Sequence, residues 1–253
     1  MTLDPKLSAY VQAVVRSFKQ VLGEGLIGAY LHGSAALGGF DSARSDVDIL
    51  AVCSRPLAAE EKRALIERLS EDVLPCPAGG LEMSVVTEDA VREATRWPRF
   101  ELHVGTKRWK TVVDGTTREG DADLVLHFAV CREYGLALFG PLPEMLFPIL
   151  PRAWMLEQMA DEMRWAEEHA DWGSGILNAC RNLRFMEDGI IGSKDDGAEW
   201  AVHRGFEPVL VTTALALRRG EGQDPLDAEA ARSLLRRARS TLGAAAHDAE
   251  GKE

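Results

Sequence analysis

Two short polar motifs, each beside an apolar run, constrain the fold of this chain most. The apolar residues 26–31 break into Gly33-Ser34, which predicts a buried strand followed by a tight turn. Asp46-Val47-Asp48 opens a second apolar run. Because successive side chains of a strand point to opposite faces, Asp46 and Asp48 share one face while Val47 points to the core. We expect the turn and the two aspartates to form one site.

The two motifs suit a phosphate and a metal ion. Small residues let backbone N–H groups approach an anion, so we expect the Gly33 N–H and the Ser34 hydroxyl to hold phosphate oxygens. Two carboxylates on one face repel unless a cation lies between them, and Mg²⁺ prefers carboxylates together with substrate phosphates. We therefore expect Asp46 and Asp48 to bind Mg²⁺, with two ions in the site. A lone Gly-Ser turn or D-x-D motif is common, and only their combination is specific.

A third carboxylate lies further along the chain. The run from Leu81 to Val86 predicts another strand, in which Glu82 points the same way as Ser84. Spacing alone would make Glu82 an exposed strand residue.

Hydrophobic periodicity divides the chain near residue 150. Helices are expected at 5–22, 58–74, 88–97 and 123–134, strands at 26–32, 46–53, 81–86, 100–104 and 136–141, and a loop at 111–121. Helices at 152–170, 175–188, 197–218 and 225–242 follow, with a frayed tail at 243–253. The predicted fold is an α/β (α+β) domain over residues 1–150, followed by an all-α helical domain over residues 151–253.

Charge and composition exclude several classes of function. The formal net charge of -11 argues against a nucleic acid partner, because a phosphate backbone needs basic surface, and it favours a cationic substrate. No apolar run approaches the ~20 residues that span a bilayer, and Met1 to Pro5 lacks the pattern of a signal peptide, so we expect a cytoplasmic protein. The four cysteines have no C-x-x-C spacing and are expected to be buried thiols.

The order strand, Gly-Ser, D-x-D, strand resembles the signature of the nucleotidyltransferase superfamily that shares the palm of DNA polymerase β. In that superfamily a helix begins at the Gly-Ser pair, so residues 34–37 are expected to form its first turn. The resemblance implies a mixed sheet.

The chain is also similar to the aminoglycoside nucleotidyltransferases, in particular the streptomycin and spectinomycin adenylyltransferases. The matching segments are L-H-G-S-A-A-L-G-G, S-D-V-D-I-L, L-E-M-S-V-V, D-L-V-L-H-F-A-V-C-R-E-Y-G-L-A-L-F-G-P and G-I-I-G-S-K-D-D-G-A-E-W-A. The resemblance implies ATP and Mg²⁺ as cofactors, Asp46 and Asp48 as metal ligands, Glu82 as catalytic base or shared metal ligand, and Lys194 as a phosphate contact.

One departure concerns the acceptor. Where the family typically carries G-E-W beside the drug, this chain has Gly105-Thr106-Lys107, with Trp109 two positions later. Either Trp109 substitutes for the family tryptophan or the acceptor differs. The first helix of the second domain is acidic, which suits a cationic acceptor, although a solvated helix face explains it equally well. Asp171 and Trp172 are the best candidates there for drug contact.

The leading hypothesis is therefore AMP transfer from ATP to a hydroxyl of an aminoglycoside or aminocyclitol, by a monomer or weak dimer. The alternatives are an antitoxin-like protein that modifies or binds a protein partner, and nucleotidyl transfer in small-molecule biosynthesis. The full helical second domain favours the first hypothesis over the second.

Overall fold

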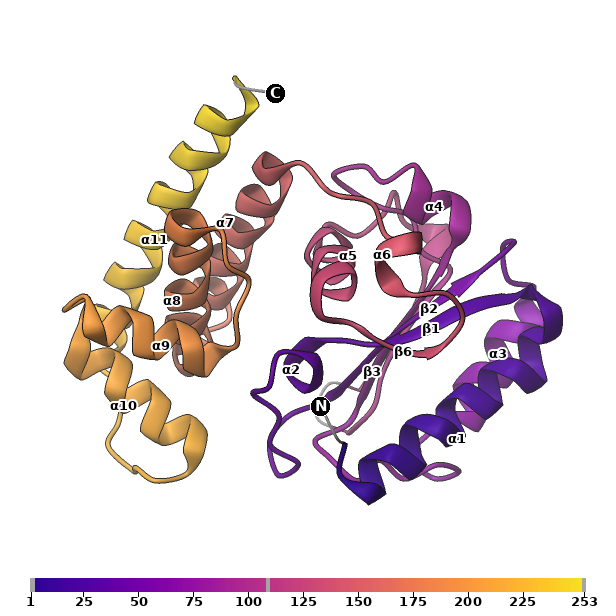
Figure 1. Ribbon diagram of the computed structural model, residues 1–253. Coiled ribbons are helices and arrows are strands. Elements are labelled where there is room, and N and C mark those ends of the chain that lie inside the picture. Colours follow the sequence, from indigo (N-terminus) through magenta and orange to yellow (C-terminus); the bar gives the residue numbers. More distant parts are fainter. Residues whose placement is uncertain (1–2, 108–109, 252–253) are drawn as a thin grey trace. The chain divides into compact units, whose positions relative to one another are not determined.

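The computed structural model describes residues 3–107 and 110–251 and divides into two compact units, residues 1–149 and residues 150–253 (Figure 1). The division lies one residue before the boundary predicted from periodicity. Among the described residues, no helix is both long and apolar enough to cross a bilayer.

The first unit is built on a six-stranded mixed sheet with strand order β5-β4-β3-β2-β1-β6, in which only β2 and β3 pair in parallel. Its strands are β1 (Leu26–Leu31), β2 (Val47–Cys53), β3 (Leu81–Thr87), β4 (Leu102–Gly105), β5 (Thr111–Asp114) and β6 (Leu136–Phe139). Its α-helices are α1 (Pro5–Leu22), α2 (Gly33–Ala36), α3 (Ala59–Arg68), α4 (Glu88–Arg92), α5 (Asp123–Tyr134) and α6 (Pro143–Leu146), with 3-10 turns at Gly23–Gly25 and Gly115–Thr117. The predicted mixed α/β fold is confirmed.

Helix α1 has the bounds predicted from its apolar period. Asp4 caps it by accepting a hydrogen bond from the Lys6 N–H at 2.8 Å, and Pro5 at the first helical position loses no intrahelical bond. Its buried stripe, which includes Val11, Val14 and Phe18, packs on the sheet face that carries Val47 and Ile49. Helix α3 ends at Arg68, earlier than the predicted residue 74, and Val73 in the segment beyond it is 60% exposed.

The other face of the sheet packs against α5 and α6, which lie opposite α1 and α3 in Figure 1. Tyr30 of β1 meets Phe147 edge to face at 5.0 Å, and Phe147 contacts Phe128 of α5. Since Val47 and Ile49 face α1, strand alternation turns Asp48 toward this second face, at the end where α2 begins.

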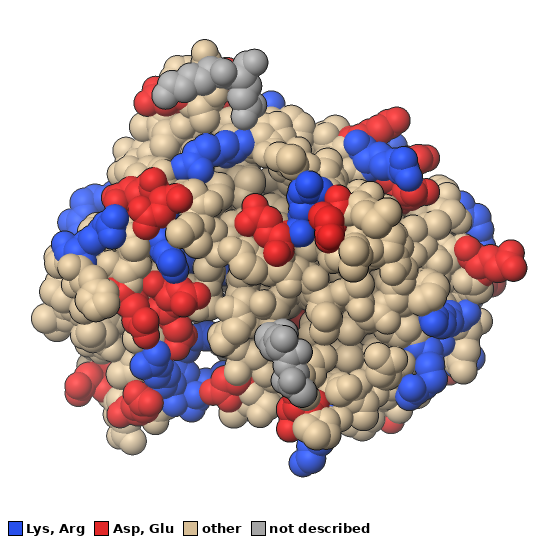
Figure 2. All heavy atoms as spheres, in the orientation of Figure 1, with Lys and Arg blue, Asp and Glu red and all other residues tan. Residues whose placement is uncertain are grey.

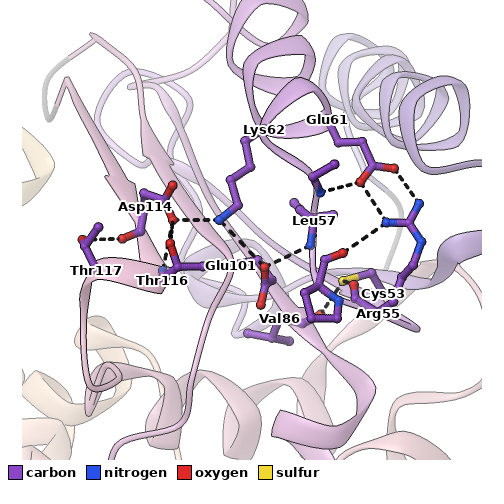
Figure 3. Close-up of polar contacts among 12 residues, drawn as sticks. Cys53, Arg55, Leu57, Glu61, Lys62, Val86, Glu101, Asp114, Thr116 and Thr117 are labelled. Carbon is purple, nitrogen blue, oxygen red and sulfur yellow. Dashed lines mark hydrogen bonds and ion pairs between the residues drawn. The ribbon is translucent and has the colours of Figure 1, made fainter.

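The expectation of a loop at 111–121 was wrong, because Thr111–Asp114 forms the edge strand β5. Figure 3 shows the contacts that hold this strand. The buried Lys62 of α3 reaches the Asp114 carboxylate at 2.7 Å and the Glu101 carboxylate at 3.8 Å. The ammonium group of Lys62 lowers the pKa of Asp114 to about 2. A strand of four residues has too short a pattern to be distinguished from a loop, and antiparallel pairing with β4 together with the ion pair from Lys62 places it.

The second unit is helical. It consists of α7 (Arg152–Glu168), α8 (Trp172–Asp188), α9 (Lys194–His203), α10 (Pro208–Arg219) and α11 (Ala228–Glu250). Helix α11 packs along α7 and α8 and extends to Glu250, so the predicted frayed tail at 243–253 was wrong. Leu242 and Ala246 are buried, which explains the extension. All four cysteines of the chain are buried free thiols, as predicted.

Candidate active site

The parallel pairing of β2 with β3 brings two carboxylates together. Asp48 is the registered partner of Glu82, and partners in a parallel pair project from the same face. Both residues are half-buried, while their neighbours Val47 and Leu81 are fully buried on the opposite face. The sheet therefore places Glu82 beside Asp48, although helix α3 and a turn-rich segment separate the two strands in the chain.

The Gly-Ser turn lies directly against Asp48. Helix α2 begins at Gly33, and the preceding His32 N–H donates to the Asp48 carbonyl at 3.0 Å. Gly33 has φ +59°, and a Cβ at this position would lie 1.9 Å from Asp48 Oδ2. Only glycine fits both the backbone conformation and this contact. The structure thus joins the predicted phosphate loop, Gly33 and Ser34, to the D-x-D motif.

Asp46 is enclosed by the loop of residues 76–80. The Gly79 N–H donates to the Ser45 carbonyl at 2.9 Å, and the Val47 N–H donates to the Gly80 carbonyl at 2.8 Å. A Cβ on Gly79 would lie 2.8 Å from Asp46 Oδ1. The two hydrogen bonds hold the backbone on either side of Asp46, and the loop lies against its carboxylate.

Burial raises the pKa of Glu82, and the charges of Asp46 and Asp121 raise it further, while His127 lowers it. A carboxylate whose pKa is shifted toward neutrality is a better proton acceptor at physiological pH. The same three interactions show that Asp46, Asp121 and His127 lie close to Glu82.

Two histidines beside these carboxylates were not predicted from the sequence as site residues. The rings of His32 and His127 lie 4.8 Å apart between centroids, and His32 is buried. Burial and the neighbouring His127 hold the pKa of His32 well below its usual value. Histidines within apolar segments on both sides of the D-x-D motif were the available sequence signal.

The donor set fits a hard divalent cation. Asp46 and Asp48 flank one strand position, and Glu82 adjoins Asp48. Within residues 3–107 and 110–251, no group of three or more His, Cys, Asp or Glu side chains converges as a metal cluster. Mg²⁺ is commonly held by one or two protein carboxylates and completed by phosphate oxygens and water, and two aspartates beside a phosphate loop satisfy that requirement.

The second unit carries a cluster of cations around Lys194. This residue opens α9 behind a capping box in which the Ser193 hydroxyl accepts the Asp196 N–H at 3.1 Å. Burial lowers the pKa of Lys194 to about 8, and the charges of Arg181 and Arg218 contribute to the decrease. Glu162 and Asp171 oppose that effect. Both arginines also have acidic partners, because Arg181 pairs with Glu162 at 3.3 Å and Arg218 pairs with Asp195 at 3.3 Å.

The acidic helix predicted as a wall for a cationic substrate is largely paired with arginine. Glu162 accepts hydrogen bonds from Asn182 at 2.8 Å and Arg181 at 3.3 Å, Asp161 pairs with Arg164, and Glu167 with Arg236. In Figure 2, acidic and basic side chains are likewise interspersed on the face shown. Much of the formal charge on α7 is therefore neutralised within the unit.

Asp171 and Trp172 lie at the start of α8 rather than at the end of the preceding helix. Asp171 caps α8 and receives the Ser174 N–H at 3.4 Å, and the Arg232 guanidinium lies 5.4 Å from the centre of the Trp172 ring. The charge of Asp171 reaches Lys194. Trp109, the other predicted substrate contact, lies outside the described residues.

Comparisons with known proteins agree with this architecture. Residues 145–242 match the family described as the aminoglycoside adenylyltransferase, C-terminal domain. The chain is 27% identical to an aminoglycoside (3'') (9) adenylyltransferase of Klebsiella pneumoniae, over 81% of this chain and 83% of the relative. It is 29% identical to a spectinomycin 9-adenylyltransferase of Staphylococcus aureus, over 79% and 80%. The predicted resemblance is confirmed.

A solved structure shares the fold. The crystal structure of spectinomycin adenyltransferase AAD(9) from Enterococcus faecialis with ATP and spectinomycin superposes with a TM-score of 0.74 at 19% identity. The match covers 92% of this chain and 98% of that chain. The two proteins therefore share a fold over most of both chains.

Proposed function

We propose that this protein transfers AMP from ATP to a hydroxyl group of an aminoglycoside or aminocyclitol antibiotic of the streptomycin or spectinomycin class, and releases pyrophosphate. The observation that carries the proposal is the register of β2 with β3, which puts Glu82 beside Asp48, next to the Gly33 turn. The similarity to adenylyltransferases along most of the chain supports the same reaction.

In this proposal Asp46 and Asp48 hold Mg²⁺. When bound, the metal would neutralise negative charge on the phosphate oxygens of ATP. Gly33 contributes an N–H and a close backbone approach, and Ser34 a hydroxyl, to the β- and γ-phosphate oxygens. The two aspartates cannot be replaced by amides without losing the negative charge that a divalent cation requires.

Glu82 accepts the proton of the acceptor hydroxyl. The oxygen then forms a bond to the α-phosphorus, the bond between the α-phosphorus and the bridging oxygen breaks, and pyrophosphate leaves with its charge. The raised pKa of Glu82 supports this role, because a pKa nearer to neutrality makes the carboxylate a better proton acceptor.

We propose that Lys194 contacts a phosphate group of ATP. The like charges of Arg181 and Arg218 beside it support an anionic ligand at this position. Arg181 and Arg218 were not predicted from the sequence, because they come from separate helices, α8 and α10, and only tertiary packing brings them to Lys194.

The acceptor is proposed to contact Asp171, Trp172 and Trp109. An aminocyclitol presents ammonium groups, which a carboxylate and an aromatic face both favour.

A panel of aminoglycosides and aminocyclitols tests the proposal, with ATP and Mg²⁺ present and pyrophosphate release as the readout. We expect release with streptomycin or spectinomycin, and a mass increase of one adenylyl group on the drug. ATP binding without pyrophosphate release for any drug, combined with adenylylation of a protein in a cell extract, would contradict the proposed acceptor.

A further inference from the structure

Lys107 follows the end of β4 by two residues, and its ammonium group has three oxygen partners. Its Nζ donates to the Ala78 carbonyl at 2.9 Å and to the Cys76 carbonyl, and it lies 3.3 Å from the Glu71 carboxylate. The cation therefore points into the loop of residues 76–80. Its three donors have three oxygen partners, so it has little capacity left for a substrate.

The backbone of Lys107 is also constrained. Its φ is +48°, which is uncommon for a residue with a side chain and costs free energy unless the surroundings require it. The adjacent Thr106 makes two hydrogen bonds with Leu81. The Thr106 N–H donates to the Leu81 carbonyl at 2.9 Å, and the Thr106 hydroxyl accepts from the Leu81 N–H at 2.9 Å. Lys107 therefore bonds to the loop of residues 76–80, while Thr106 bonds to the first residue of β3.

The loop held by Lys107 is the one that encloses Asp46. Gly79 and Gly80 bond to the residues on either side of Asp46, and a Cβ on Gly80 would lie 3.3 Å from Asp46 Oδ1. A continuous chain of contacts therefore runs from the Lys107 ammonium through two carbonyls to the backbone around one aspartate of the D-x-D motif. We propose that Lys107 is a positioning residue, which holds the 76–80 loop against Asp46 and so orients this carboxylate for the metal.

This inference rests on the proposed metal role of Asp46. It predicts that loss of the Lys107 ammonium loosens one metal ligand while leaving the acceptor site unchanged. A substrate contact at the same position would behave in the opposite way, because it would change the KM for the drug and leave metal binding intact.

The test compares Lys107→Met, which keeps most of the stem but removes the donors, with Lys107→Arg, which restores donors, and with Lys110→Met on an exposed neighbour. The first readout is amide hydrogen exchange in the metal-free protein. We expect faster exchange at the Gly79 and Val47 amides in Lys107→Met, with rates near those of the wild type in the other two variants. Exchange that rises evenly throughout the first unit would overturn the inference.

The second readout is binding of Mn²⁺ alone, followed by electron paramagnetic resonance. We expect about tenfold weaker binding in Lys107→Met, in line with residues that orient metal ligands, and recovery in Lys107→Arg. Equal Mn²⁺ affinity in Lys107→Met and the wild type would overturn the inference. A wild type that binds no Mn²⁺ would instead overturn the proposed metal role of Asp46. In that case the hydrogen-exchange data still decide whether Lys107 holds the loop. Should Lys107→Met fail to fold, Lys107→Gln removes the same charge with a shorter polar side chain and takes its place in both measurements.

Discussion

Each unit contains a titratable side chain with neighbours of like charge, acidic in the first unit and basic in the second. In the first unit the sheet gathers carboxylates around Glu82, whose pKa rises through burial and through its acidic neighbours. In the second unit three helices gather cations around Lys194, whose pKa falls through burial and through its basic neighbours. Like charges lie close together in each arrangement, although in the second unit Arg181 also pairs with Glu162 and Arg218 with Asp195.

The difference between the units lies in how the charges are held. In the first unit, backbone pairing between β2 and β3 places Asp48 beside Glu82. Side chains from α8, α9 and α10 make the cationic cluster, so helix packing sets it. A divalent cation suits the first arrangement and a triphosphate the second, and substitutions in each unit can test the two assignments separately.

The largest effect is expected for Asp48→Asn. Removal of one metal-binding charge should lower AMP transfer by about 10³-fold or more, because a bound metal supplies several kcal/mol of charge stabilisation. The metal-free variant should unfold at the same or higher denaturant concentration than the wild type, since one repulsive charge is lost. Steady-state pyrophosphate release and urea unfolding measure the two effects, with the exposed Asp89→Asn as control. Mg²⁺-dependent turnover equal to that of the wild type would remove Asp48 from the site.

Glu82→Gln should separate chemistry from binding. Loss of a positioned base typically lowers the rate by ~10²- to 10⁴-fold, while ATP and Mg²⁺ should still bind. Single-turnover transfer and calorimetric affinity distinguish the cases, since loss of both would make Glu82 a metal ligand. Retention of both would make it an ordinary strand residue.

The raised pKa of Glu82 also predicts a pH-dependent effect on stability. A carboxyl whose folded-state pKa exceeds its unfolded value contributes stability that is fully present below the unfolded pKa and is lost as the pH rises through the folded pKa. Above that window the ionised carboxylate is unfavourable, so Glu82→Gln should stabilise the metal-free protein at neutral pH and not at pH 4. Urea unfolding at the two pH values measures this effect, and an equal change in stability at both would contradict a raised pKa of Glu82.

Lys194 should couple ATP binding to proton uptake. With a pKa of about 8, roughly half of the Lys194 side chains are neutral at pH 8, and an anionic triphosphate favours the charged form. Binding at pH 8 should therefore take up about half a proton, and affinity should increase as the pH falls toward 7. Calorimetry in buffers of different ionisation enthalpy measures the proton uptake. Lys194→Met should abolish this uptake and weaken ATP binding about tenfold. Uptake that persists in Lys194→Met would assign the proton to another group.

The last prediction concerns the close approach of Gly33 to Asp48. Gly33→Ala should destabilise the protein by about 1–2 kcal/mol through its positive φ and by a further amount through contact with Asp48 Oδ2. Gly38→Ala is the matched control, because Gly38 also has a positive φ, +79°, but no described atom lies within 4 Å of the place that its Cβ would take. Equal losses in urea unfolding would show that Asp48 moves aside without cost.

Local patterns were sufficient for much of the first unit. The period of α1, the alternation around Asp46 and Asp48, and the strand carrying Glu82 could be predicted because each depends on side chains near one another in sequence. Failures occurred where distant residues decide the structure. The edge strand β5 depends on Lys62 and Asp114, which lie on separate elements.

Hydrophobic periodicity was enough to predict the fold class, and short motifs were enough to locate the Gly33-Ser34 turn and the D-x-D motif, whereas Lys194 was singled out only through the resemblance to a known family. Only the tertiary structure decided that Lys107 faces the 76–80 loop and that Arg181 and Arg218 surround Lys194. It also decided that α11 continues to Glu250, since the buried Leu242 and Ala246 stabilise its last turns. The physical reason is common to all three. Charge pairing and burial depend on which side chains meet in space, and a linear pattern specifies periodicity but not the partner.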